Sequence, residues 1–173
     1  MASLRRSALV SLLFTIFGGP GWVLIYLPLW FTGFHLPAGA PLWRTLLAGV
    51  LIFAGLTPLL NSIRRFIYVG RGTLVPGVPT ERLVVSGFYR YVRNPMYIGV
   101  LIALAGEAIL LWRRILVVEA VFAWLFFFLF VLLYEEPTLA RRYPEDYRRY
   151  QRHVPRWLPR LTPWDDSQPE TER

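Results

Sequence analysis

The stretch "PMYIGVLIALAGEAILLWRRILVVEAVFAWLFFFLFVLLYEE", residues 95–136, decides the fold of this chain. It contains two apolar runs, residues 95–112 and 115–134, which are joined only by Arg113-Arg114. As helices these runs are roughly 27 and 30 Å long, close to the thickness of the hydrocarbon core of a bilayer. So short a connection predicts an antiparallel helical hairpin. The hairpin returns Glu135-Glu136 to the membrane level at which the first run begins.

The rest of the chain extends the same pattern. Of its 173 residues 55% are hydrophobic and only 17% are charged, a composition that is unusual for a soluble domain. Two further apolar segments cover residues 8–31 and 42–63. We therefore expect an all-α, polytopic membrane bundle of about four transmembrane helices, with the first two inside residues 1–63.

The first apolar segment is interrupted by Gly18-Gly19-Pro20-Gly21, which also suits a re-entrant hairpin with short arms. Arginine placement favours a kinked crossing instead. All 19 basic residues are arginine, and the net charge is +8. With four crossings, one side of the membrane receives only Arg44, Arg113 and Arg114, whereas a hairpin would add Arg5 and Arg6 to that side.

This asymmetry follows the positive-inside rule and predicts that both termini lie in the cytoplasm. It explains the positive charge better than nucleic-acid binding does. We expect a multi-pass protein of a bacterial inner membrane, with membrane lipids as its neighbours. The chain has no cysteine and only two histidines, so we expect no disulfide, no thiol nucleophile and no metal site.

Two polar regions flank the hairpin. Residues 64–94 read as a cytoplasmic linker that is punctuated by Gly and Pro, and residues 135–163 as a C-terminal segment. Within that segment Pro144 suits the first position of an interfacial helix that ends near His153. The polar tail, residues 164–173, is expected to be disordered.

The two ends of the hairpin carry complementary chemistry. Asn94 suits an N-cap, and a helix N-terminus beside Arg93 makes an anion site. At the other end, Pro137 is expected to stop the helix at Glu136, so that two carboxylates meet a helix C-terminus and form a cation site. An alternative is that Arg141 or Arg142 neutralises these carboxylates. If the anion site and the cation site are both free to bind a ligand, they would suit a zwitterion such as S-adenosylmethionine, with tyrosines around its sulfonium.

The motif residues of the two ends, taken together, carry a family resemblance. They are Gly87, Tyr89, Arg93, Pro95, Tyr97, Gly99, Glu135-Glu136, Tyr147, Tyr150 and the run "VPRWLP". With these residues, the region from about Leu83 to Pro159 resembles the superfamily of isoprenylcysteine carboxyl methyltransferases and phospholipid methyltransferases, which are integral-membrane enzymes that use S-adenosylmethionine. The N-terminal half matches only as generic membrane helices.

The resemblance implies a site on the cytosolic side that the C-terminal segment covers. It implies that Glu135 and Glu136 hold the ammonium end of S-adenosylmethionine and that Arg93 orients an anionic group of a lipophilic acceptor. The catalytic candidates are Arg93 and Asn94. The other candidates for cofactor binding are Tyr89, Asn94, Pro95, Tyr97, Gly99, Tyr147 and Tyr150.

One position departs from the family, because Asn94 stands where the family has histidine. Asparagine does not titrate near neutral pH and cannot serve as a general base. A carboxylate acceptor is already ionised at pH 7 and needs no base, which favours methyl-ester formation. The alternatives are a phospholipid or amine N-methyltransferase, a non-catalytic membrane subunit on the same scaffold, and a membrane reductase that uses a nicotinamide cofactor.

Several residues also have a purely structural interpretation. Gly99 suits close packing of two helices, and Tyr89 suits an aromatic belt at the membrane surface. Tyr147 and Tyr150 share a helix face that suits contact with lipid headgroups. Glu107 lies within an apolar run, where a buried polar contact or a protonated acid is favoured over a role at the site.

Overall fold

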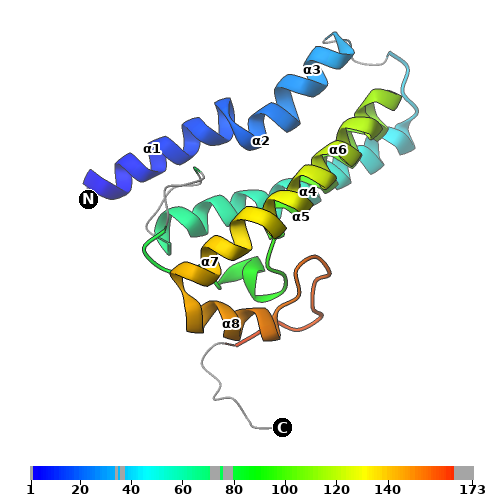
Figure 1. Ribbon diagram of the computed structural model, residues 1–173. Helices are drawn as coiled ribbons and strands as arrows, with labels where there is room; N and C mark the ends of the chain where they lie inside the picture. The colour runs from blue at the N-terminus through cyan, green and yellow to red at the C-terminus, as the bar shows by residue number, and fades with distance from the viewer. Residues whose placement is uncertain (1, 34, 36–37, 71–74, 76–79, 166–173) are drawn as a thin grey trace.

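The computed structural model describes residues 2–33, 35, 38–70, 75 and 80–165 (Figure 1). All regular secondary structure in these ranges is helical, which confirms the predicted all-α fold class. Three helical stretches are long and apolar enough to cross a membrane, and a fourth apolar helix is shorter. These are Arg6–Thr32, Leu42–Tyr68, Arg114–Arg142 and, as the shorter one, Pro95–Leu111.

The first span is an interrupted helix. Its pieces follow one another in one direction, so the chain does not turn back at the Gly-Pro break (Figure 1). This arrangement agrees with a kinked crossing and not with a re-entrant hairpin. The pieces are α1 (Ala2–Phe17), α2 (Gly19–Gly21), the π-helical turn η1 (Trp22–Tyr26) and α3 (Leu27–Thr32).

The second span, α4 (Leu42–Tyr68), continues beyond the predicted end at Ile63 into the region that was expected to be linker. It packs closely on α5 (Pro95–Leu111) where Gly99 faces Gly55. A Cβ atom on Gly99 would lie 2.5 Å from the carbonyl oxygen of Gly55. Glycines therefore let the two backbones approach, as small residues do between membrane helices.

The predicted hairpin is present. Helix α5 is followed by α6 (Arg114–Phe130), and Trp112, in the left-handed conformation with φ 51°, helps to form the tight connection. Buried side chains from α4, α5 and α6 form the core of the bundle. These are Leu59, Val100, Leu104 and Phe127.

The prediction that Pro137 stops the helix is wrong. After α6 the chain forms a π-helical turn, η3 (Val131–Glu135), and continues as α7 (Glu136–Arg142). Proline lacks an N–H and its ring collides with a carbonyl of the preceding turn in a regular α-helix. The wider π-turn, in which Glu136 N–H donates to Val131 O, accommodates the proline, so the helix continues through it. The two carboxylates thus lie within a helix and not at a C-terminus.

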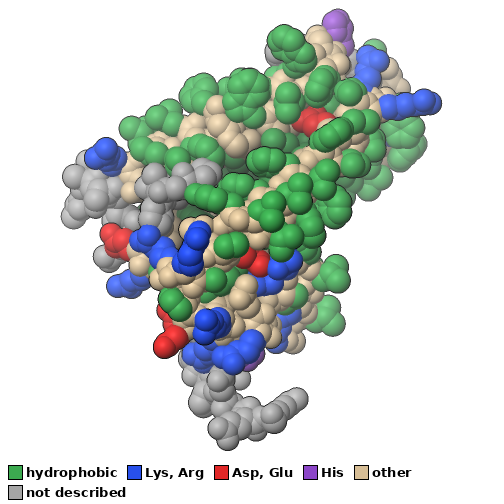
Figure 2. Space-filling view, viewed as in Figure 1, with side chains coloured by type: hydrophobic (Ala, Val, Ile, Leu, Met, Phe, Trp, Pro, Cys, Tyr) green, Lys and Arg blue, Asp and Glu red, His purple; other side chains and the backbone are tan. Residues whose placement is uncertain are grey.

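Within the C-terminal segment, α8 (Pro144–His153) starts and ends where the sequence predicts. The face of α8 that carries Tyr147 and Tyr150 does not contact lipid headgroups, because both side chains are buried against Val154 and Trp164. Figure 2 shows hydrophobic side chains over the membrane helices, while arginine and acidic side chains gather around α7 and α8.

Residues 154–165 run back along the segment that precedes α5. Backbone N–H groups of Arg93, Arg160 and Trp164 donate to carbonyl oxygens across this pairing, each at 2.9 Å. Trp164 is buried, so the predicted start of the tail at residue 164 is too early. Residues 166–173 lie outside the described residues, as do residues 71–74 and 76–79 of the predicted linker.

Candidate active site

A cavity of about 480 Å³ lies at the end of the hairpin at which α5 begins. Its walls come from α4, the 3₁₀ turn η2 (Gly87–Arg90), the first turn of α5, and the chain from Phe130 to Tyr150. Apolar and aromatic side chains form much of the wall, and a few charged groups face the same space. The hairpin therefore brings together residues that are some forty positions apart in sequence, as predicted.

Eight of the ten predicted site residues line this cavity. They are Tyr89, Arg93, Asn94, Tyr97, Glu135, Glu136, Tyr147 and Tyr150. The other two, Pro95 and Gly99, do not. Pro95 faces a different groove, and Gly99 lies at the contact of α5 with α4, which corresponds to the packing alternative considered from sequence.

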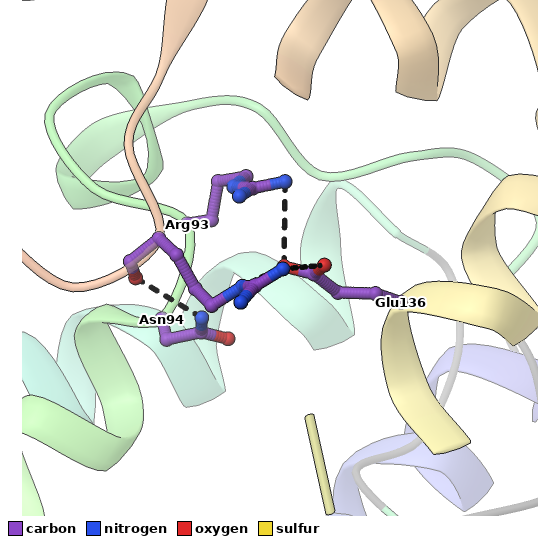
Figure 3. Close-up of polar contacts among 4 residues, drawn as sticks. Arg93, Asn94 and Glu136 are labelled. Atoms are coloured by element: carbon purple, nitrogen blue, oxygen red, sulfur yellow. Dashed lines mark hydrogen bonds and ion pairs between the residues drawn. The ribbon is translucent and has the colours of Figure 1, made fainter. Parts of the chain in front are cut away.

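Glu136 is the centre of a buried ion-pair cluster (Figure 3). Arg156 donates to both of its oxygens, Nε to Oε1 at 2.8 Å and Nη2 to Oε2 at 2.7 Å. Arg93 Nη1 lies 3.3 Å from Oε1. Two arginines thus neutralise one carboxylate, and neither is the Arg141 or Arg142 that the sequence suggested.

Glu135 has a different environment from its neighbour. Its Oε2 accepts a hydrogen bond of 2.7 Å from the Tyr97 hydroxyl, and the Tyr97 ring stacks on Phe127 with 4.7 Å between ring centroids. Among the described residues no arginine forms an ion pair with Glu135. It is therefore the carboxylate that can give the cavity a negative pole.

Arg93 supplies the opposite pole. Its side chain is 11% exposed, and neither Nε nor Nη1 makes a hydrogen bond with a described residue, although Nη1 is close to Glu136. Its backbone N–H donates to the Pro155 carbonyl, which holds the backbone at this position. Buried guanidinium donors without acceptors are costly, so an anion that reaches them is stabilised.

Asn94 occupies the N-cap position of α5, but its side chain does not cap the helix. Instead Nδ2 donates to the Arg156 carbonyl at 3.1 Å (Figure 3). The expected side-chain cap is absent, because the Asn94 side chain is oriented by its bond to the Arg156 carbonyl and its oxygen accepts no N–H of the first helical turn. Asn94, which is buried, thus connects the start of α5 to the residue that holds Glu136.

The tyrosines form a neutral aromatic wall. Burial raises the pKa of the Tyr89, Tyr147 and Tyr150 phenols above the ordinary value of about 10. The Tyr150 hydroxyl donates to the Tyr89 carbonyl at 2.7 Å, which holds α8 against η2. At neutral pH these phenols are uncharged, so they can face a cation or donate hydrogen bonds but do not act as anions.

Sequence reasoning missed Arg156 as a site residue and did not identify the apolar wall. Arg156 stood within the matched run "VPRWLP", but nothing in the sequence says which acid it meets. The apolar wall combines residues from four separate parts of the chain, which only the fold brings together. Its members include Phe66, Leu83, Met96, Phe130 and Leu139.

Comparison with known proteins adds one finding. The model of the family "Phospholipid methyltransferase" matches residues 43–146, which is more than half of the chain. Comparisons with curated proteins and with solved structures found no match. The matched range contains all of α4 except Leu42, the hairpin, both glutamates and the start of α8. The chain therefore belongs to the phospholipid methyltransferase family, within the superfamily of membrane methyltransferases that the motifs at the two ends of its hairpin predicted.

Proposed function

We propose that this membrane methyltransferase moves a methyl group from S-adenosylmethionine to the carboxylate of a lipophilic acceptor, forming a methyl ester. One observation carries the proposal: Glu135, a carboxylate, and Arg93, a guanidinium, line the same cavity. Within the described part of the chain Glu135 has no arginine partner, and Nε and Nη1 of Arg93 make no hydrogen bond. Its volume of about 480 Å³ lies within the range typical of small-molecule sites, roughly 300–1,000 Å³.

The residues present fit S-adenosylmethionine. Glu135 is placed to hold its ammonium group, and the neutral tyrosine wall suits its sulfonium through cation–π attraction. The acceptor's carboxylate is assigned to the free donors of Arg93. Glu136 has both oxygens occupied by Arg156, so its assigned role is to hold the C-terminal segment in place and not to bind the cofactor.

When bound, S-adenosylmethionine supplies a methyl group on a positively charged sulfur, which an anion can attack directly. The chain's contribution is to position the acceptor and to exclude water. Arg93 orients the attacking oxygen, and the apolar wall around Met96 and Phe130 keeps the site dry. Asn94 is assigned a positioning role and not a chemical one, since its amide donates a hydrogen bond to the Arg156 carbonyl. No general base is required, because the acceptor is already ionised.

A second candidate is N-methylation of an amine, such as a phospholipid headgroup. The family match favours it, and Glu135 is a carboxylate that is able to accept a proton from an ammonium group. The two candidates differ in their pH dependence. An amine must lose a proton before it attacks, so its methylation falls steeply below neutral pH. Ester formation stays nearly constant until the acceptor acid itself is protonated, at about pH 4–5.

The experiment is to incubate the purified protein with methyl-labelled S-adenosylmethionine and a total lipid extract, and then to identify the labelled product. The proposal expects a base-labile methyl ester, formed at similar rates from pH 6 to pH 8. A base-stable N-methyl product that disappears below neutral pH supports the second candidate. Folded protein that neither binds the cofactor nor transfers label contradicts both, and competition by a nicotinamide cofactor would then indicate a reductase.

A further inference from the structure

We propose that a second groove, separate from the cavity, binds an anionic phospholipid of the surrounding leaflet, with its phosphate at Arg65 and Arg90 and an acyl chain along α4. The groove has a volume of about 880 Å³ and lies between α4, η2, the start of α5 and the C-terminal segment. None of its lining residues lines the cavity. The groove and the cavity are therefore separate sites.

One stripe of α4 forms the floor of this groove. Phe53, Thr57, Asn61 and Arg65 follow one another at intervals of four residues, so they lie on one side of the helix over roughly 18 Å. Along the stripe the side chains change from aromatic to hydroxyl to amide to guanidinium. A phospholipid shows the same order, from acyl chain through glycerol esters to phosphate.

The charged end of the groove has donors to offer. Arg65 makes one long hydrogen bond, from Nη1 to Ser86 Oγ at 3.4 Å, and Arg90 donates from Nε to the Trp164 carbonyl at 2.6 Å. Neither arginine forms an ion pair with a carboxylate of the described residues. Two guanidinium groups with unused N–H donors at one site suit a phosphate diester.

Asn61 and Gly87 support a polar group at the intermediate depth. Asn61 Oδ1 is buried and has no hydrogen-bond partner among the described residues. Gly87 has a φ of +65°, and a Cβ there would lie 2.6 Å from Asn61 Oδ1 and 3.1 Å from Arg65 Nε. The glycine thus keeps this part of the groove open at the depth of the glycerol backbone. The anionic headgroup of a lipid such as phosphatidylglycerol then lies beyond it, at Arg65 and Arg90.

The mouth of the groove opens toward lipid. Phe53, on a membrane-spanning helix, is 75% exposed. At the other border, Leu158 and Leu161 of the C-terminal segment are 80% and 100% exposed, flanking Pro159, which lines the groove. Exposed leucines beside arginines are typical of a segment that rests in the headgroup region. The molecules available to such a groove are the lipids of that leaflet.

The test compares lipid retention by native mass spectrometry of delipidated protein, to which phosphatidylglycerol or phosphatidylcholine is added back. We expect one phosphatidylglycerol to bind to the wild-type protein, with phosphatidylcholine bound at least about tenfold more weakly. The double variant Arg65→Gln/Arg90→Gln should lose this preference. Arg64→Gln, an exposed neighbour outside the groove, removes a similar charge and should keep it.

A second pair of variants tests the apolar part without touching an arginine. Ala54→Trp fills the groove and should abolish the bound lipid, whereas Val50→Trp, one turn away and outside the lining, should not. Equal binding of the two lipids, or retention of phosphatidylglycerol by both the double variant and Ala54→Trp, would overturn the proposal. If the double variant does not fold, the tryptophan pair decides.

Discussion

Arg156 chelates the carboxylate of Glu136 through two hydrogen bonds of 2.8 and 2.7 Å, although the two residues lie on opposite sides of α8 in the sequence. The contact ties the chain that follows α8 to the helical stretch that carries both glutamates. It also leaves Glu135 as the carboxylate of this pair that no arginine of the described ranges contacts in an ion pair. One ion pair thus distinguishes the two glutamates and leaves Glu135 as the acid assigned to bind a cation.

The first prediction concerns this ion pair. Arg156→Gln should lower the free energy of unfolding by about 2–3 kcal/mol, because it leaves the buried carboxylate of Glu136 with Arg93 alone. Arg156→Lys should recover only part of the loss, since lysine cannot donate to both oxygens in the geometry of a guanidinium. Thermal unfolding in detergent measures both. Arg148→Gln, on the exposed side of α8, is the control and should leave stability unchanged. A stability of Arg156→Gln equal to that of the control would show that the pair contributes little.

Much of the fold could be predicted because the apolar runs have the length of a bilayer and the connection at Arg113-Arg114 is too short for any path but a tight return. The end of α8 could be predicted equally well, because Pro155 disfavours a helix at the residue before it. The helix through Pro137 could not be predicted in this way. A proline usually ends a helix, and whether a π-turn accommodates it instead depends on what the following residues pack against in the folded protein.

The site was predictable to a similar extent. The sequence placed Arg93 and Glu135-Glu136 at one end of a hairpin, and the structure puts them around one cavity. It could not divide the roles of the two glutamates, because that division depends on Arg156, which arrives from a segment twenty residues further along. Likewise, the motif alone did not show that Gly99 faces Gly55 instead of the cavity.

The second prediction separates the two glutamates. Glu135→Gln keeps an acceptor for the Tyr97 hydroxyl but removes the charge, so the protein should stay folded while its Kd for S-adenosylmethionine rises by roughly 10- to 100-fold. Glu136→Gln should instead lower the thermal unfolding temperature, because it leaves two arginines without their carboxylate. Isothermal titration calorimetry and thermal unfolding measure the two effects. Unchanged cofactor affinity in Glu135→Gln would remove this residue from the proposed site.

The third prediction tests the role of Gly99. Gly99→Ala should destabilise the protein by about 1–3 kcal/mol, because its Cβ would meet the Gly55 carbonyl at 2.5 Å and the Leu59 nitrogen at 3.1 Å, and neither backbone can move easily. Gly49→Ala, on the same α4 but with no atom within 4 Å of the added Cβ, should be neutral or slightly stabilising. The affinity of folded Gly99→Ala for S-adenosylmethionine should remain within about twofold of the wild type. A large loss of affinity without a loss of stability would instead support the contact with the cofactor that the motif suggested.

The fourth prediction concerns alkaline pH. The pKa of Tyr150 is raised by burial in the folded protein, whereas in the unfolded chain the phenol ionises at about pH 10. Its contribution to stability is therefore complete below pH 10 and is lost as the pH rises further, because only the unfolded state readily releases the proton. Tyr150→Phe should be less stable than wild type by about 1 kcal/mol at pH 8, since it loses the bond to the Tyr89 carbonyl, but it should lose less stability between pH 8 and pH 11. Thermal unfolding across this range measures the difference. Tyr68→Phe, which changes an exposed tyrosine, is the control and should follow the wild-type curve. If Tyr150→Phe loses as much stability between pH 8 and pH 11 as Tyr68→Phe does, the buried phenol of Tyr150 is not responsible for the alkaline loss.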